Sequence, residues 1–201
     1  MPALFTFSAP RFSAALLPMG RFANAILPSP CGSTHPAQES DALSPDLPFR
    51  SVQDSLVEMT EIVLPEDTNP RGTIFGGRVL ALIDKCAAVT AMRHSRSEVV
   101  TVSLDSVEFR SNVRVGNILV LHSRLNAAFA SSMEVEVEVH SEDPFTGQRK
   151  LTTRAFVTMV ALDENARPAP VPTLSLSTDD ERDRAAQAAE RRTTRLSRRV
   201  H

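Results

Sequence analysis

The sequence predicts an α+β domain in which an antiparallel sheet covers one long helix. Apolar side chains recur at three- and four-residue spacing from residue 76 to residue 93, which is the period of an α-helix. One strand-like segment precedes that helix and four follow it: 56–64, 99–109, 118–126, 133–140 and 151–162. One strand, a long helix and then a run of strands is the element order of this fold class.

One of these segments, 133–140, has the plainest alternation in the chain. Between Met133 and Val139 every second residue is apolar, and the residues between them are Glu134, Glu136 and Glu138. A period of two residues predicts a strand with one buried face and one face in water. A single sheet over one helix also leaves strand edges and an outer helix face uncovered, so we expect the protein to form an oligomer.

Length, charge and cysteine usage exclude several classes of protein. The chain of 201 residues suits one domain with tails, and a formal net charge of −2 gives no strong field for nucleic acid or a membrane surface. No stretch is apolar enough to span a membrane. The five histidines stand singly, so we expect no metal site. Cys31 and Cys86 are far apart, and we expect two reduced thiols rather than a disulfide.

Residues 1–50 differ in composition from the rest of the chain and are expected to be a leader. No Asp, Glu or Lys precedes Glu39, whereas Arg11 and Arg21 stand among Ala, Ser, Phe and Pro. Such a segment is typical of an organellar transit peptide, of a disordered extension, or of a start codon assigned too far upstream. We therefore expect a cytoplasmic protein, with an organelle as the alternative if the leader is a transit peptide.

Residues 173–201 form a charged tail with a predicted helix. Thr178 and Glu181 fit a capping box, acids occupy the first turn, and arginines fill the far end, as the helix dipole favours. The pattern fits a solvated terminal helix. A basic arm that binds phosphate or a partner is the alternative.

The start of the long helix carries two groups that are suited to chemistry. Gly76 and Gly77 permit a tight turn and a close approach of the backbone, and their N–H groups lie at a helix N-terminus, where negative charge is favoured. Asp84 is a single carboxylate on a largely apolar helix, which costs free energy unless the group is paired or lies at a wet cleft. In the structural alternative, Asp84 bonds a neighbouring backbone group or arginine, and the glycines only form the turn.

The stretch from Asp67 to Gly77, followed by the helix with Asp84, resembles the hotdog-fold acyl-coenzyme A thioesterases. Within them it resembles the branch of bacterial short-chain and animal cytosolic acyl-CoA hydrolases. The resemblance spans about residues 52–172 and continues through five further motifs: 100–102, 107–109, 115–117, 131–135 and 156–163. It implies a hotdog domain at 51–172, hydrolysis of acyl-CoA to free CoA and a carboxylic acid, and homodimers or a trimer of dimers. It implies no cofactor, because coenzyme A is part of the substrate.

The resemblance assigns the chemistry to the start of the same helix. Asp84 takes the role of a general base or of a direct nucleophile, and both roles remain open. The amide of Gly77, together with that of Gly76, polarises the thioester carbonyl. Thr73 stands where the animal enzymes carry an Asn that takes part in their activity, so its hydroxyl is a further catalytic candidate.

Five residues outside that helix are candidates for holding the substrate. Ser131 and Ser132 resemble a segment that lies near the bound coenzyme in the family. Arg110 and Arg114 are cations near loops that could bind its phosphates, with plain solvated charges as the alternative. Asn69 lies in the loop before the helix, where forming the turn is the alternative to contacting the substrate.

Gly77 and Asp84 are too far apart to act on one carbonyl from within one chain. Seven residues of helix separate them by about 10 Å along the axis, whereas a reacting carbon must lie about 3 Å from both groups. We therefore expect each active site to join two protomers.

Other functions remain as alternatives on the same fold. One is a non-catalytic acyl-CoA binding or sensing protein, which has the pocket but no water placed for attack. A hydratase or dehydratase is a rival enzyme, but such relatives use a catalytic histidine, and none occurs in residues 72–84.

Overall fold

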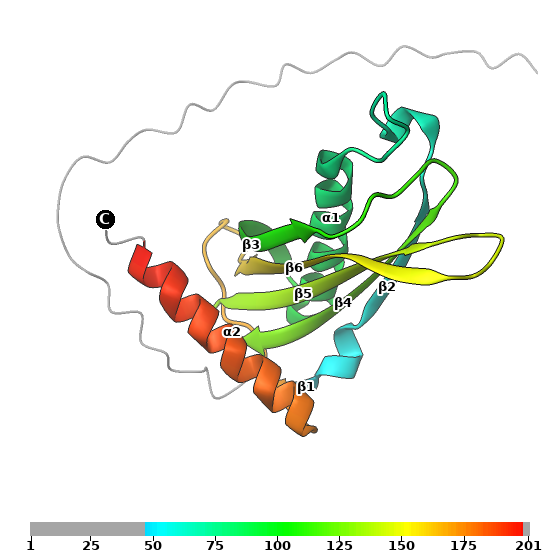
Figure 1. The fold of residues 1–201 in the computed structure, drawn as a ribbon. Helices are drawn as coiled ribbons and strands as arrows, with labels where there is room; N and C mark the ends of the chain where they lie inside the picture. Colours follow the sequence, from blue (N-terminus) through cyan, green and yellow to red (C-terminus); the bar gives the residue numbers. More distant parts are fainter. Residues whose placement is uncertain (1–46, 199–201) are drawn as a thin grey trace, which may run out of the picture. The chain divides into compact units, whose positions relative to one another are not determined.

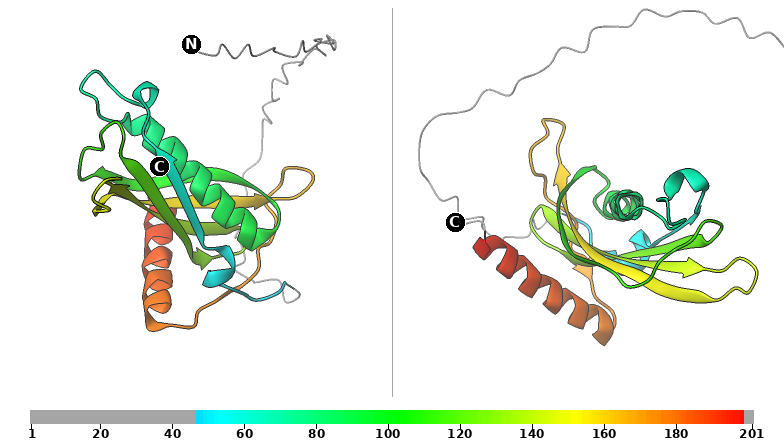
Figure 2. Two further views of the ribbon diagram at one scale, coloured as in Figure 1. Left: turned by 90° about the vertical axis from the view of Figure 1, so that its right-hand side faces the viewer. Right: turned by 45° about the horizontal axis from the view of Figure 1, so that its top comes forward.

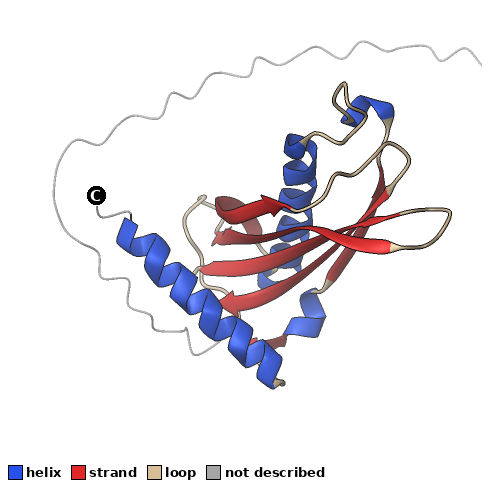
Figure 3. Cartoon of the chain, viewed as in Figure 1, coloured by secondary structure: helices blue, strands red, loops and turns tan. Residues whose placement is uncertain are grey.

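Residues 47–198 are described by the structure, a computed structural model, and they build a five-stranded sheet with one long helix on each face (Figures 1 and 3). The predicted leader up to residue 46, with Cys31, lies outside the described residues. Within the described range, no helix is both long and apolar enough to cross a membrane.

The helices are η1 (Val52–Ser55), η2 (Pro65–Asp67), α1 (Gly76–Ser95) and α2 (Asp179–Ser197), where η marks a 3₁₀ helix. The strands are β1 (Arg50–Ser51), β2 (Val57–Ile62), β3 (Glu98–Phe109), β4 (Ile118–Ala128), β5 (Ser132–Glu142), β6 (Arg149–Leu162) and β7 (Leu174–Ser175).

The sheet has the strand order β2-β4-β5-β6-β3, and every neighbouring pair in it is antiparallel. The predicted α+β order of one strand, a long helix and four strands is confirmed, and each boundary agrees to within two residues. The short strands β1 and β7 pair in parallel and were not predicted. Because β3 is the last strand in the order, one of its edges has no strand beside it among the described residues.

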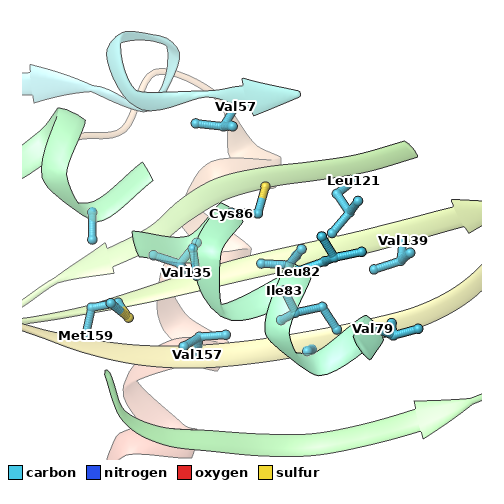
Figure 4. Packing of buried hydrophobic residues seen from close by; sticks show 14 of the residues in the cluster. Val57, Val79, Leu82, Ile83, Cys86, Leu121, Val135, Val139, Val157 and Met159 are labelled. Atoms are coloured by element: carbon cyan, nitrogen blue, oxygen red, sulfur yellow. The ribbon is translucent and has the colours of Figure 1, made fainter. Parts of the chain in front are cut away.

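Helix α1 packs one side against the sheet and leaves the other side uncovered. Its buried side chains include Leu82, Ile83 and Cys86, which lie near strand residues such as Val135 and Val157 (Figure 4). Fully burying an aliphatic side chain contributes about 1.5–3 kcal/mol, so this side holds the helix in place. In the single chain, α1 is therefore buried on one side only. The side away from the sheet carries exposed residues: Gly77, Ala81, Lys85 and Met92.

A β-bulge in β3 decides which of its side chains face which helix. Thr101 pairs with Met159 and Ser103 pairs with Thr158, so Val102 is an extra residue in β3. The extra residue shifts the alternation of side chains by one position. Thr101 therefore lies on the α1 side of the sheet, whereas Ser103 lies on the α2 side.

Helix α2 lies across the face of the sheet opposite α1 (Figure 2), and it covers Glu134 and Glu136 of β5. Arg184 contacts Glu136 at 2.6 Å, and Arg191 contacts Glu134 at 2.7 Å. Glu136 is 2 % exposed and Glu134 is 1 % exposed, while Ala188, between the two arginines, is fully buried. The predictions of a glutamate face in water and of a solvated terminal helix are therefore wrong, because the arginine side of α2 replaces water at this face.

Candidate active site

The loop before α1 is a turn that Asn69 closes through its side chain and backbone. Gly72 has a φ of +71°, a left-handed conformation that favours glycine. Asn69 Oδ1 accepts a hydrogen bond from the Arg71 N–H at 2.9 Å, and its Nδ2 donates to Thr73 Oγ1 at 2.9 Å. The Asn69 N–H also donates to the Thr73 carbonyl at 2.9 Å. Asn69 therefore closes this turn, and its side chain positions the Thr73 hydroxyl.

This loop and the start of α1 are tied to the rest of the chain on two sides. The Ile74 N–H donates to the Val113 carbonyl at 2.9 Å, which joins the loop to the segment between β3 and β4. Arg78, in the first turn of α1, forms ion pairs with Glu61 at 2.7 Å and with Asp67 at 2.9 Å. These contacts hold the helix N-terminus in a fixed position.

Gly76 and Gly77 are the first two residues of α1, and they serve different purposes. No described residue accepts a hydrogen bond from either N–H, as expected of the first turn of a helix, and this first turn contains no acid. A Cβ atom at Gly76 would lie 3.3 Å from Cζ of Phe109, so glycine lets the Phe109 ring pack on the helix. A Cβ atom at Gly77 would meet nothing within 4 Å. The open approach to the helix N-terminus is thus at Gly77, and the left-handed turn is at Gly72 rather than at the paired glycines.

Asp84 is half-buried on α1, and a hydroxyl of β3 holds its carboxylate. Thr101 Oγ1 donates to Asp84 Oδ1 at 2.5 Å and lies 3.3 Å from Met159 Sδ. The partner of Asp84 is thus neither a backbone group nor an arginine, which were the two structural alternatives. Sequence reasoning missed Thr101 as a site residue. Its position in β3 could be predicted, but the strand pattern does not show that it reaches the helix.

Three of the predicted site residues share one polar cleft. Asn69, Thr73 and Arg114 line a cleft of about 580 Å³ together with Arg71 and Asn112. The two arginines place positive charge beside the loop that precedes α1.

The other predicted cation, Arg110, does not line this cleft. It is exposed and lies 3.7 Å from Glu108 on the same strand end.

The structure does not bring Ser131 and Ser132 to this cleft. They lie at the hairpin between β4 and β5, and Ser132 pairs with Val160, which in turn pairs with Val100. Ser132, Val160 and Val100 thus form a row across three strands, and Val100 is the neighbour of Thr101 in β3. Within one chain the two serines therefore belong to the Asp84 end of β3, whereas Asn69, Thr73 and the N-terminus of α1 belong to its Phe109 end.

Two further reactive side chains on α1 are buried and structural. His94 is fully buried with Nε2 2.9 Å from the Pro172 carbonyl, and loss of solvation lowers the pKa of its ring. The Cys86 thiol donates to Ser123 Oγ at 3.3 Å, and burial raises its pKa, so it is a poor nucleophile. No three His, Cys, Asp or Glu side chains of the described range are grouped to hold a metal ion.

The chain has the arrangement of a hotdog-fold thioesterase. A curved antiparallel sheet packs around one long helix, and that helix carries a carboxylate and has free amides at its start. Residues 71–147 match the thioesterase superfamily. The chain belongs to this family.

Relatives and solved structures agree with that assignment. An uncharacterized acyl-CoA thioester hydrolase of Bacillus subtilis is 40% identical over 152 residues, which are 76% of this chain and 88% of the relative. A solved apo-hexameric acyl-CoA thioesterase has a TM-score of 0.72 and 47% identity, covering 76% of this chain and 97% of that one. An acyl-CoA hydrolase of Staphylococcus aureus, solved with butyryl coenzyme A, coenzyme A and coenzyme A disulfide, has a TM-score of 0.71 and 37% identity over 76% of this chain and 93% of its own.

Solved variants of the Staphylococcus aureus enzyme mark three of its positions. They replace one asparagine, one aspartate and one threonine by alanine, and the three positions are 15 and 17 residues apart. Asn69, Asp84 and Thr101 have the same two separations in this chain.

Proposed function

We propose that this protein is an acyl-CoA thioesterase that hydrolyses acyl-CoA to free CoA and a carboxylic acid. The Asp84 carboxylate carries the proposal. Thr101 holds one of its oxygens, while the other has no donor and no cation beside it among the described residues. A carboxylate that is oriented but not neutralised can take a proton from water or attack a carbonyl carbon itself.

The reaction balances with either role of Asp84. As a base, Asp84 accepts a proton from a water molecule whose oxygen attacks the carbonyl carbon; the C–S bond then breaks, and the sulfur of CoA takes the proton. As a nucleophile, its oxygen displaces the CoA thiolate and forms an anhydride; the hydroxyl of a water molecule then bonds to the acyl carbon and frees Asp84, and the proton of that water goes to the CoA sulfur. In both cases the N–H groups of Gly77 and Gly76 stabilise the negative charge on the carbonyl oxygen.

The relatives support this assignment in two ways. The Bacillus subtilis relative is named an acyl-CoA thioester hydrolase, and the Staphylococcus aureus enzyme was solved with butyryl coenzyme A. The shared separations of Asn69, Asp84 and Thr101 support a joint role of these three residues in this chain. Asn69 orders the loop, Asp84 acts on the thioester, and Thr101 orients Asp84.

We propose that two protomers join along the free edge of β3. This edge carries exposed apolar side chains, Val100, Val102 and Phe109, which water disfavours. Suppose that the β3 strands of the two protomers pair in antiparallel, with Asp105 of one opposite Asp105 of the other. Phe109 of one protomer then lies opposite Thr101 of the other. Since Phe109 packs on Gly76 and Thr101 on Asp84, this pairing places the amides of one protomer beside the carboxylate of its partner.

The same pairing supplies contacts for coenzyme A from both chains. The cleft with Arg71 and Arg114 offers two cations for phosphates beside the α1 N-terminus. Ser131 and Ser132 lie at the Asp84 end of β3 in their own chain. The two serines of the partner protomer would therefore approach this cleft only across the interface. Arg110, which pairs with Glu108, is the weaker candidate of the predicted cations.

The assembly, cofactor and compartment follow from the same proposal. Two neighbours are described as hexameric, and we propose homodimers that associate further into a trimer of dimers. The described reaction uses water, a carboxylate and backbone amides, and thus no cofactor. We place it in the cytoplasm, with an organelle as the alternative if residues 1–50 are a transit peptide.

Incubation with a panel of acyl-CoAs and a thiol reagent tests the function directly. We expect release of free CoA, and Asp84→Asn is expected to lower kcat by a factor of about 10² or more, because it removes the base or nucleophile. Asp183→Asn on the exposed side of α2 is the matched control and should retain full activity.

Two results would speak against the proposal. Near-normal kcat in a folded Asp84→Asn protein would remove Asp84 from the chemistry. Tight binding of acyl-CoA by the natural protein without release of free CoA would favour the alternative, a non-catalytic acyl-CoA binding or sensing protein.

A further inference from the structure

A cavity of about 210 Å³ lies beside the start of α1, between the preceding loop and the ends of β3 and β6. Ile74, Val79 and Phe109 contribute apolar walls, and Ser111 contributes a hydroxyl. The cavity also touches Gly76, whose N–H is one of the proposed donors to the carbonyl oxygen. An acyl chain attached to that carbonyl therefore has this cavity next to it.

Phe109, the last residue of the edge strand β3, lines this cavity. Its ring packs on Gly76, since a Cβ atom there would lie 3.3 Å from Cζ of the ring. The side chain is 52 % exposed, so only part of the ring is fixed by the chain itself. Shortening this side chain would lengthen the cavity toward the edge without removing a core residue.

Ser111 leaves a hydrogen bond unused at the cavity. Its Oγ is buried and has no partner among the described residues. The nearby Thr152 hydroxyl, by contrast, donates to the Val139 carbonyl at 2.9 Å. Buried hydroxyls are nearly always hydrogen-bonded, so a group that enters the cavity, either water or an oxygen of the substrate, must satisfy Ser111.

The volume of this cavity, about 210 Å³, matches a short acyl group. A cavity of about 150 Å³ holds benzene, with six carbon atoms, so this one holds about eight non-hydrogen atoms. We propose that the cavity is the acyl-chain site of the thioesterase and that it favours short acyl groups with a hydroxyl or keto oxygen. Phe109 sets the chain length, and Ser111 binds the oxygen. This inference rests on the proposed function.

Selection of the oxygen is tested with butyryl-CoA and 3-hydroxybutyryl-CoA. The natural protein should prefer the hydroxylated substrate in kcat/KM by about tenfold, the factor that one hydrogen bond of ordinary strength supplies. Ser111→Ala should bring the ratio of the two kcat/KM values close to one, whereas Ser175→Ala, at the exposed position of β7, should not change it. A ratio that Ser111→Ala leaves unchanged would mean that this hydroxyl binds water only, and would overturn the role of Ser111.

Selection of chain length is tested with dodecanoyl-CoA, because its acyl group has more non-hydrogen atoms than the cavity can hold. Phe109→Ala should raise the ratio of kcat/KM for dodecanoyl-CoA to that for butyryl-CoA by at least about tenfold. Phe145→Ala is the control, because Phe145 is 96 % exposed at the hairpin between β5 and β6. An unchanged ratio in a Phe109→Ala protein with a normal melting temperature would overturn the placement of the acyl chain.

The two levels of the proposal fail differently. If the natural protein hydrolyses none of the three substrates, the proposed thioesterase function fails and the acyl site fails with it. If it hydrolyses them but neither variant moves its ratio, the acyl site alone is wrong.

Discussion

Asp84 and His94 lie on one helix, and their surroundings give them different uses. Asp84 lies at a half-buried position, and only one of its oxygens accepts a hydrogen bond from the described residues, so the other oxygen remains accessible. His94 is fully buried, with one ring nitrogen at the Pro172 carbonyl and the other without a partner among the described residues. Burial disfavours the charged ring, with Arg50 adding to this and Asp54 opposing it.

The depressed pKa of His94 predicts a pH-dependent loss of stability. The unfolded chain binds a proton near pH 6.5, while the folded chain resists it to lower pH. Stability is therefore fully present above about pH 6.5 and is lost as the pH falls toward the folded pKa, by at most about 1.4 kcal/mol per pH unit. Urea unfolding at pH 5.0 to 7.0 should show a flatter dependence for His94→Gln than for the natural protein.

The control for this experiment is Met92→Gln, because Met92 is exposed on the same helix and carries no titratable group. It should keep the pH dependence of the natural protein. Equal slopes for His94→Gln and the natural protein would show that His94 does not contribute to the pH dependence.

At the residue scale, the sequence identified the carboxylate but not the group that holds it. Asp84 stands out because one acid falls among apolar residues, and that signal is local. Thr101 is 17 positions away, and its contact with Asp84 depends on how β3 lies against α1, which only the assembled sheet decides. The roles of Gly76 and Gly77 likewise separate only when the position of Phe109 is known.

At the scale of elements, α2 is held on the sheet mainly by charges. Besides the pairs of Arg184 and Arg191 with the β5 glutamates, Arg195 contacts Asp105 on β3 at 2.8 Å. The hydrogen bond to Asp180 and the nearby Glu136 raise the pKa of Arg184 further above its ordinary value. Because Ala188 is the one fully buried side chain of the described helix, hydrophobic contact contributes little here.

Breaking one of these pairs should cost far more than breaking an exposed one. Arg191→Met leaves the buried Glu134 carboxylate without its guanidinium, and we expect a loss of about 3 kcal/mol in the free energy of unfolding. Adding Glu134→Gln should restore most of that loss, because the uncompensated charge is then gone. Denaturant unfolding of the single and double variants measures both effects.

The exposed pair of Arg182 and Asp179, 2.6 Å apart, provides the control. Arg182→Met should cost less than about 1 kcal/mol. A comparable cost for Arg182→Met and Arg191→Met would mean that burial of Glu134 does not set the energy of the contact.

The positions of the helices and strands were largely predictable from the sequence. Which face of each element is buried was not. Periods of two and of about 3.6 residues placed five strands and α1 within two residues of their observed ends, and the capping box placed the start of α2 at Thr178. Alternation at Glu134 and Glu136 predicted a face in water, because glutamate is usually solvated. The pattern carries no information about a second element that brings arginines to that face.

At the scale of the whole molecule, the proposed mechanism gives one chain half of an active site at each end of β3. The free amides of Gly76 and Gly77 lie toward Phe109, and Asp84 lies at Thr101. Along α1 the two groups remain about 10 Å apart, so one carbonyl cannot meet both within one chain. The central claim of the proposed mechanism is that pairing along β3 completes two sites from two chains.

Complementation between two inactive variants tests this claim most directly. Asp84→Ala removes the carboxylate, and Gly77→Val blocks the approach of the carbonyl to the helix N-terminus. A Cβ atom at Gly77 meets open space, so the second variant should still fold. After mixing and re-annealing, a mixed dimer should hold one site with both defects and one with neither, and should recover about half of the natural activity per dimer. Mixed dimers as inactive as both parents would contradict the shared site.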